Sequence, residues 1–213
     1  MSGDLAKRWQ AAGEVALIVG LILLIIWVVK PLHEETLDRG LRVLAVALML
    51  GSTWIHGDSR QRLGLRLDNF GPALARVSPL SVVAMATSLG AGAAFGSIRS
   101  PRGPVAFELA YYFVWAMAQQ YGLNAVALRR LEDAGCGGSA PFVAAALFSL
   151  LHAPNPALMI LTFLGAWLWC TTFRRHPNLF ALAISHACLA VTIVNALPPQ
   201  VTGGLHIGRR VVG

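Results

Sequence analysis

Five polar residues with useful chemistry lie inside apolar stretches of the sequence: Gln119, Gln120, Asn124, His152 and His186. An imidazole exchanges protons near neutral pH, and a glutamine amide can orient water or donate a hydrogen bond to an oxyanion. Ionisable groups at bilayer depth are candidates for a functional site. Gln120 and Asn124 are four residues apart, so we expect their amides to share one side of a helix and to satisfy each other.

A structural role is the alternative for each of these residues taken alone. Gln, Asn and His side chains link transmembrane helices through hydrogen bonds of about 1 kcal/mol each. Two histidines on different helices, together with an adjacent glutamine pair, favour a site, because every buried polar group needs its own compensating partner.

The elements that carry these residues are predicted to be transmembrane helices. Only 13% of the 213 residues are charged, against about 25% in soluble domains, and 56% are hydrophobic. Asp, Glu, Lys and Arg are absent from 15–29, 43–57, 77–98, 140–173 and 177–208, and 103–128 contains only Glu108. Because about 20 helical residues cross a bilayer, we predict an all-α, polytopic transmembrane bundle of about six to eight helices. Soluble, secreted and disordered classes are excluded.

The expected helices cover 13–30, 41–56, 74–96, 104–130, 157–173 and 178–197. The stretch 140–173 is too long for one helix and is interrupted by the sequence HAPNP at 152–156. We expect 140–152 to form a half-helix that ends at His152 within the membrane, followed by a kink, a turn or a re-entrant loop. Residues 1–213 are predicted to form a single membrane domain, with a flexible tail at 198–213.

Basic residues give the chain a net charge of +7, but they occur in ones and twos at the ends of the apolar stretches. This distribution is typical of anchors to lipid headgroups. The lipid bilayer is therefore an expected partner, and nucleic acid is excluded. The three cysteines lack the spacing of a metal or disulfide motif, so we interpret them as unpaired.

Three segments in order carry a resemblance to a known family: QQYGLN at 119–124, FSLLH at 148–152 and SHACLA at 185–190. They resemble the motifs of the CAAX-protease and bacteriocin-processing (CPBP) family of intramembrane endopeptidases. That family carries E-E-x-x-x-R, then F-x-x-x-H, then H-x-x-x-N or H-x-x-x-D. The segment RLGLR at 62–66 is also similar to one found before the core of bacterial members. The resemblance covers a CAAX-protease-like core of about 60–190.

The resemblance implies cleavage of peptide bonds in membrane-associated or hydrophobic substrates, in a bacterial inner (cytoplasmic) membrane. It assigns catalytic roles to His152, His186, Gln119 and Gln120. The candidates for substrate binding are Asn124, Phe148 and Asn155. No cofactor and no metal are expected, because two histidines without a carboxylate or thiolate make a poor metal set.

The sequence departs from the family at the residues that activate water. Glutamines replace both glutamates, Asn124 replaces the arginine and Ala190 replaces the final asparagine. A neutral amide cannot take a proton from water, so neither glutamine can be the general base. The nearest carboxylate, Glu108, precedes Gln119 by eleven residues, about 16 Å along a helix. We interpret Glu108 as a carboxylate near a helix amino terminus.

Three hypotheses follow. In the first, the chain is a membrane endopeptidase with His152 as base, while His186, Gln119 and Gln120 bind water and stabilise the oxyanion. In the second, it has lost catalysis and binds a membrane peptide or lipidated tail as a chaperone, immunity or sorting factor. In the third, the polar residues line the path of a small transporter, although no inverted repeat supports this.

Overall fold

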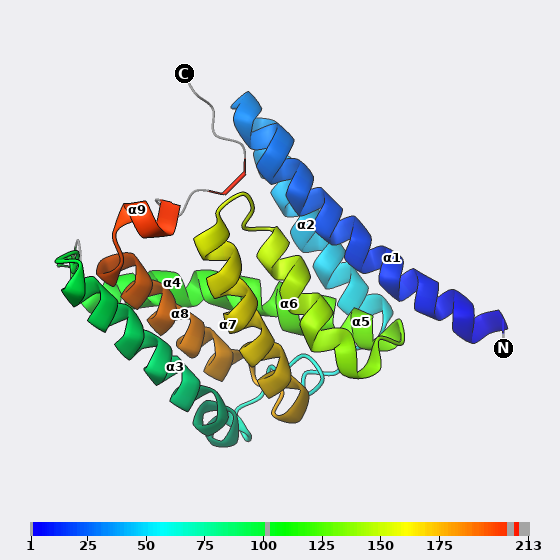
Figure 1. Cartoon of the computed structure of the whole chain (residues 1–213). Coiled ribbons are helices and arrows are strands. Elements are labelled where there is room, and N and C mark those ends of the chain that lie inside the picture. Colours follow the sequence, from blue (N-terminus) through cyan, green and yellow to red (C-terminus); the bar gives the residue numbers. More distant parts are fainter. Residues whose placement is uncertain (1, 101–102, 204–206, 209–213) are drawn as a thin grey trace. The chain divides into compact units, whose positions relative to one another are not determined.

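The computed structural model describes residues 2–100, 103–203 and 207–208, and every regular element in that part of the chain is a helix (Figure 1). The all-α prediction is therefore confirmed. The helices are α1 (Ser2–Leu24), α2 (Glu35–Ile55), α3 (Phe70–Ala94), α4 (Val105–Gln120), α5 (Arg129–Asp133), α6 (Ala140–Leu150), α7 (Pro156–Arg175), α8 (Leu179–Ala196) and α9 (Pro199–Thr202). Short π- or 3₁₀-helical segments are η1 (Ile25–Val29), η2 (Lys30–Leu32), η3 (Tyr121–Leu128) and η4 (Gly137–Ser139).

Four of the described helical segments are long and apolar enough to cross a membrane: Gly3–Leu32, Phe70–Ala94, Pro156–Arg175 and Leu179–Ala196. The segment Gly137–Leu150 is apolar but shorter, as expected for the half-helix before His152. The expected spans at 41–56 and 104–130 are also helical, but α2 carries charged residues in its first two turns and α4 gives way to the π-helical η3. The chain is an integral membrane protein.

The chain forms two compact units, each assembled from separate stretches of sequence. Unit 1 contains Met1–Asp58, Gly122–Trp167 and His206–Gly213, and unit 2 contains Ser59–Tyr121 and Leu168–Leu205. That residues 1–213 act as one membrane domain stays a prediction. Half of the tail predicted to be flexible, at 204–206 and 209–213, lies outside the described residues, while 199–202 form α9.

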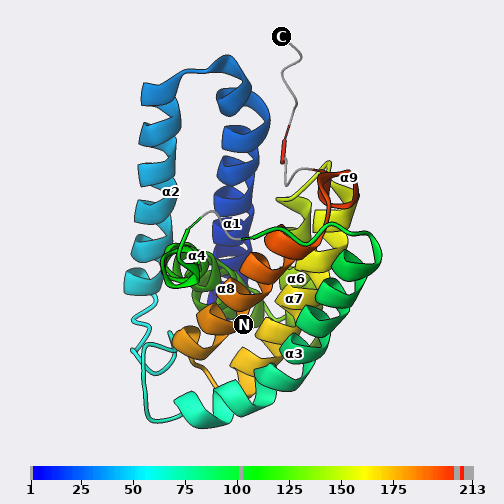
Figure 2. The same cartoon turned by 90° about the vertical axis from the view of Figure 1, so that its left-hand side faces the viewer.

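Unit 1 is built from two helical hairpins. Figure 2 shows α1 and α2 side by side, joined at one end by the turn at 33–34. The second hairpin is α6 and the part of α7 up to Trp167. There the rings of Phe142 and Phe163 meet with centroids 5.4 Å apart, and Ser149 Oγ donates to Met159 O at 2.7 Å. The predicted interruption at 152–156 is thus a turn between two antiparallel helices.

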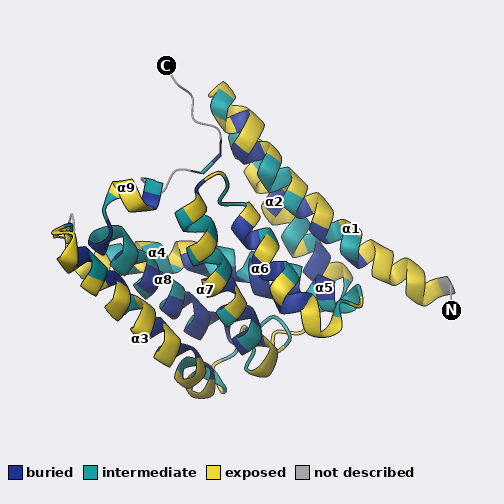
Figure 3. Ribbon diagram, viewed as in Figure 1, coloured by how far each residue is buried: buried dark blue, intermediate teal, exposed yellow. Residues whose placement is uncertain are grey.

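Unit 2 is organised around α8, which packs against α3 and α4. Asn178 starts α8 as its N-cap, because its side-chain oxygen accepts a hydrogen bond from Ala181 N at 2.9 Å. Half of α8 is buried, whereas α3 exposes large apolar side chains such as Leu80, Val82 and Val83 (Figure 3). Exposed apolar surface of this kind is what a helix facing lipid requires.

The RLGLR segment lies against the start of α8, within unit 2. Leu179 N donates to Gly64 O at 2.9 Å, and Asn178 Nδ2 donates to Arg66 O at 2.7 Å. The Arg66 guanidinium also hydrogen-bonds the carboxylate of Asp68, which holds the pKa of that carboxyl below its usual value. The backbone contacts require Gly64 in particular, because its φ is +73° and an added Cβ would lie 2.6 Å from Phe173 Cε2.

We expect Gly64→Ala to destabilise the protein by about 2–4 kcal/mol, which combines left-handed backbone strain with overpacking against Phe173. The matched control is Gly57→Ala, where φ is +62° but no atom lies within 4 Å of an added Cβ. That control carries the backbone strain alone, about 1–2 kcal/mol. Thermal unfolding in detergent measures both, and equal losses in the two variants would contradict the packing argument.

Candidate active site

His152 lies in the turn between α6 and α7, and its ring is fixed by the preceding helical turn. Its Nδ1 is 2.8 Å from the carbonyl oxygen of Phe148, and the two rings are 4.9 Å apart at their centroids. A carbonyl oxygen only accepts hydrogen bonds, so Nδ1 carries the proton and Nε2 of the neutral ring holds the lone pair. This is the tautomer that can take a proton through Nε2.

Asn155 and Phe148, both proposed as substrate-binding residues, have structural contacts in this turn. Asn155 is 7% exposed, and its Oδ1 accepts from Leu158 N at 3.1 Å, so it caps the first turn of α7. Phe148 is 8% exposed and packs on His152. Both residues therefore have structural contacts in this turn, and their roles in substrate binding stay predictions.

Gln120 and His186, which the motifs nominated separately, meet between α4 and α8. Gln120 Nε2 lies 3.4 Å from His186 Nδ1, and the Gln120 side chain is fully buried. The two helices approach closely because small residues, Ala116, Ala183 and Ala187, form their contact. An amide nitrogen donates, so Nδ1 of His186 accepts, and its neutral ring carries the proton on Nε2.

The two histidines therefore have opposite tautomers. His152 is protonated on Nδ1 and can accept a proton at Nε2, whereas His186 is protonated on Nε2 and can donate from it. Such a pair of environments suits one ring to proton abstraction and the other to hydrogen-bond donation.

The described contacts bring together Gln120 with His186 in unit 2, and Phe148 with His152 in unit 1. Gln119 lies in unit 2, at the end of α4, and is partly exposed. Asn124 belongs to unit 1, where it is buried in the π-helical η3. The mutual amide contact expected between Gln120 and Asn124 stays a prediction. The motif nevertheless coincides with a π-helical segment, a feature frequent at functional sites.

One family model matches most of the chain: type II CAAX prenyl endopeptidase Rce1-like, over residues 16–192. The chain belongs to this family. No curated protein and no solved structure matches it.

The Rce1-like match extends over every residue that the sequence motifs nominated, from Gln119 to His186. It also extends over Glu108, for which the structure supports a structural role. Glu108 lies in the first turn of α4, and Asn195 Nδ2 of α8 donates to its Oε2 at 3.3 Å.

Among the residues that the structure describes, no three His, Cys, Asp or Glu side chains are grouped so that they could hold a metal ion.

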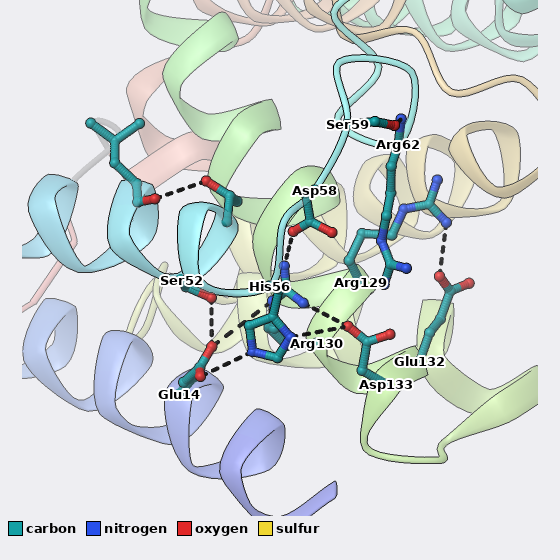
Figure 4. Close-up of polar contacts among 12 residues, drawn as sticks. Glu14, Ser52, His56, Asp58, Ser59, Arg62, Arg129, Arg130, Glu132 and Asp133 are labelled. Atoms are coloured by element: carbon teal, nitrogen blue, oxygen red, sulfur yellow. Dashed lines mark hydrogen bonds and ion pairs between the residues drawn. The ribbon is translucent and has the colours of Figure 1, made fainter. Parts of the chain in front are cut away.

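Sequence analysis missed a second polar assembly in this Rce1-like chain, within unit 1. We name it the Arg130 cluster; its members are Glu14, Ser52, His56, Asp58, Arg130 and Asp133 (Figure 4). Arg130 Nη1 donates to Asp133 Oδ2 at 2.6 Å, and Nη2 pairs with Asp58. Arg130 and Asp58 are 0% and 1% exposed at their side chains. Glu132 and Asp133, at the end of α5, are also partly buried in ion pairs.

The Arg130 cluster joins three helices. Glu14 of α1 accepts from Ser52 of α2 at 2.5 Å and lies 3.1 Å from His56 Nε2. His56 Nδ1 is in turn 4.0 Å from Asp133 of α5. The carboxylates of Glu14, Asp58 and Asp133 therefore surround the guanidinium of Arg130. Its positive charge offsets the free-energy cost of burying these negative charges.

The depth of this cluster follows from the length of α1. Leu32, at the turn into α2, is 18 residues after Glu14, which corresponds to about 27 Å of helix and thus to about one hydrocarbon thickness. With the turn at one face of the bilayer, Glu14 lies near the other. One feature of the sequence could have indicated the Arg130 cluster. Polar and charged residues lie near helix ends that fall on the same side of the membrane: Glu14, His56, Asp58 and Arg130.

Proposed function

We propose that this chain is an endopeptidase that cleaves hydrophobic or membrane-anchored peptides in a bacterial inner membrane, with His152 as its general base. The single observation that carries the proposal is the hydrogen bond between His152 Nδ1 and the Phe148 carbonyl. It leaves Nε2 with the lone pair that a base requires, and it replaces the carboxylate that would otherwise orient the ring.

In the proposed reaction, Nε2 of His152 removes a proton from water as the water oxygen attacks the scissile carbonyl carbon. The carbonyl π bond breaks and its electrons form an oxyanion, which accepts hydrogen bonds from Nε2–H of His186 and from the Gln119 or Gln120 amide. When the C–N bond breaks, the amine nitrogen receives the proton from His152. The products are a carboxylic acid and an amine, and no other reactant is consumed.

A second candidate function is peptide binding without cleavage. The observation that favours it is the neutral pair formed by Gln120 and His186, in which neither group needs a charge. A binding protein of this kind would hold a peptide carbonyl with the same donors and would lack proton transfer.

Restoring the glutamates separates the two functions. We compare newly generated protein termini, by mass spectrometry, in membranes that contain the wild-type chain, the Gln119→Glu/Gln120→Glu variant, or no copy of the protein. The endopeptidase proposal predicts termini that depend on the wild-type chain. Termini that arise only with the glutamate variant would overturn it in favour of binding. Gln61→Glu, the same change at an exposed position, controls for added charge.

A further inference from the structure

The His186 ring lies against an aromatic neighbour that the proposed reaction has not used. Trp169 of α7 stacks on it with ring centroids 4.3 Å apart and an angle of 26° between the planes. Trp169 is only 3% exposed, so its large side chain has little freedom to move. Both residues belong to unit 2.

The side chains one helical turn away from His186 on α8 are apolar. One turn after His186 is Ala190, which has only a methyl group, and one turn before it is the buried, apolar Leu182. Two groups from other helices contact the imidazole: Gln120 of α4 at one ring nitrogen, and the indole of Trp169 at the ring face.

The indole is itself held by a chain of buried hydroxyl groups. Trp169 Nε1 donates to Ser185 Oγ at 3.1 Å, and Ser185 Oγ is 2.8 Å from Ser81 Oγ. Ser81 Oγ donates onward to Val77 O at 2.8 Å. An indole N–H can only donate a hydrogen bond, and a backbone carbonyl can only accept one. Trp169 therefore donates to Ser185, Ser185 donates to Ser81, and Ser81 donates to the backbone of α3. Ser81 and Ser185 are 3% and 5% exposed, so water does not compete strongly for these bonds.

We propose that Trp169 is a positioning residue for His186, and that the Ser185–Ser81 chain fixes the plane of its indole. Stacking sets the tilt of the imidazole, while the Gln120 amide sets its rotation and tautomer. The direction of the His186 Nε2–H bond is then determined before any peptide binds. The catalytic consequence rests on the proposed function, whereas the orientation of the ring does not.

Two readouts test the proposal separately. The first is the NMR spectrum of the histidine rings in purified, ¹⁵N-histidine-labelled protein, with the His186 signals assigned by their loss in His186→Gln. An indole stacked on a ring shifts its protons upfield, so we expect the His186 ring protons to be shifted in the wild type. The upfield shift of the His186 ring protons should be lost in Trp169→Leu and retained in part in Trp169→Phe, which keeps a flat ring. Ser185→Ala should reduce the shift although the aromatic side chain remains. Trp167→Leu, an exposed neighbour on the same helix, should leave it unchanged.

The second readout is the rate of peptide cleavage, which applies if the wild-type protein cleaves peptides. Because a displaced catalytic group can cost about 10²-fold in rate, we expect Trp169→Leu to lower kcat by about 10²-fold with KM little changed, and Ser185→Ala to lower it less. An unshifted His186 ring in the wild type, or a shift that survives in Trp169→Leu, would overturn the proposal whatever the activity. Unchanged kcat in Trp169→Leu would overturn its role in catalysis. A wild type that never cleaves refutes the proposed function, and the NMR result then decides the positioning role alone.

Discussion

Replacing Arg130 by methionine is expected to destabilise the folded protein by about 3–5 kcal/mol, because removing one partner of a buried ion pair leaves an uncompensated charge. The Asp58 side chain, 1% exposed, would lose its guanidinium partner while it stays enclosed. Glu14 and Asp133 would lose the same cation, at 3.9 and 2.6 Å. Methionine retains much of the volume of the arginine side chain, so the loss measures charge rather than packing.

The matched control is the neighbouring residue. Arg129 Nη1 pairs with Glu132 at 2.9 Å, and the two side chains are 14% and 21% exposed. Because a pair in contact with water contributes less, Arg129→Met should cost about 1 kcal/mol. Thermal unfolding of the purified protein in detergent measures both variants.

A double variant sharpens this experiment. Asp58→Leu combined with Arg130→Met removes both members of the most deeply buried pair. Because replacing both partners by apolar groups is often close to neutral, we expect the double variant to recover part of the stability lost in Arg130→Met. Equal losses in Arg130→Met and Arg129→Met, or a double variant that is less stable than Arg130→Met, would show that the Arg130 cluster does not hold α1, α2 and α5 together.

Much of the fold was predictable because bilayer thickness constrains helix length. The expected helices at 157–173 and 178–197 match α7 and α8 to within a residue or two at each end. The turn after His152 followed from two prolines and from the short half-helix before it. Less predictable was the start of α1 at Ser2, eleven residues before the expected boundary, because charged residues are tolerated in a helix that continues beyond the hydrocarbon.

The family motifs nominated Gln120 and His186 as separate site residues, and only the structure shows that their side chains meet. The stacking of Trp169 and the Arg130 cluster were not predicted at all. Both depend on which faces of helices far apart in the sequence meet, and no periodicity within a single helix encodes that choice. His56 illustrates the difficulty: at a predicted helix end it had no assigned role, and only its contacts with Glu14 and Asp133 reveal one.

His152→Ala is expected to slow peptide cleavage by about 10²–10⁴-fold, the range supplied by general acid–base catalysis. The ring contributes proton transfer, and alanine cannot accept a proton. His152→Gln retains a polar side chain of similar length but is no base near neutral pH, so we expect it to be as slow as His152→Ala. His176→Ala, a histidine at the turn before α8 with no proposed role, should cleave at the wild-type rate.

The role of His152 as general base is tested most directly by the rate at which new protein termini form in native membranes. Separate membrane samples contain equal amounts of either the wild-type or the His152→Ala protein. Thermal unfolding of the purified variants verifies that each is folded. We expect termini to accumulate with the wild type and with His176→Ala, and to be nearly absent with His152→Ala and His152→Gln. Termini that form at the wild-type rate in His152→Ala would contradict the assignment of His152 as the general base.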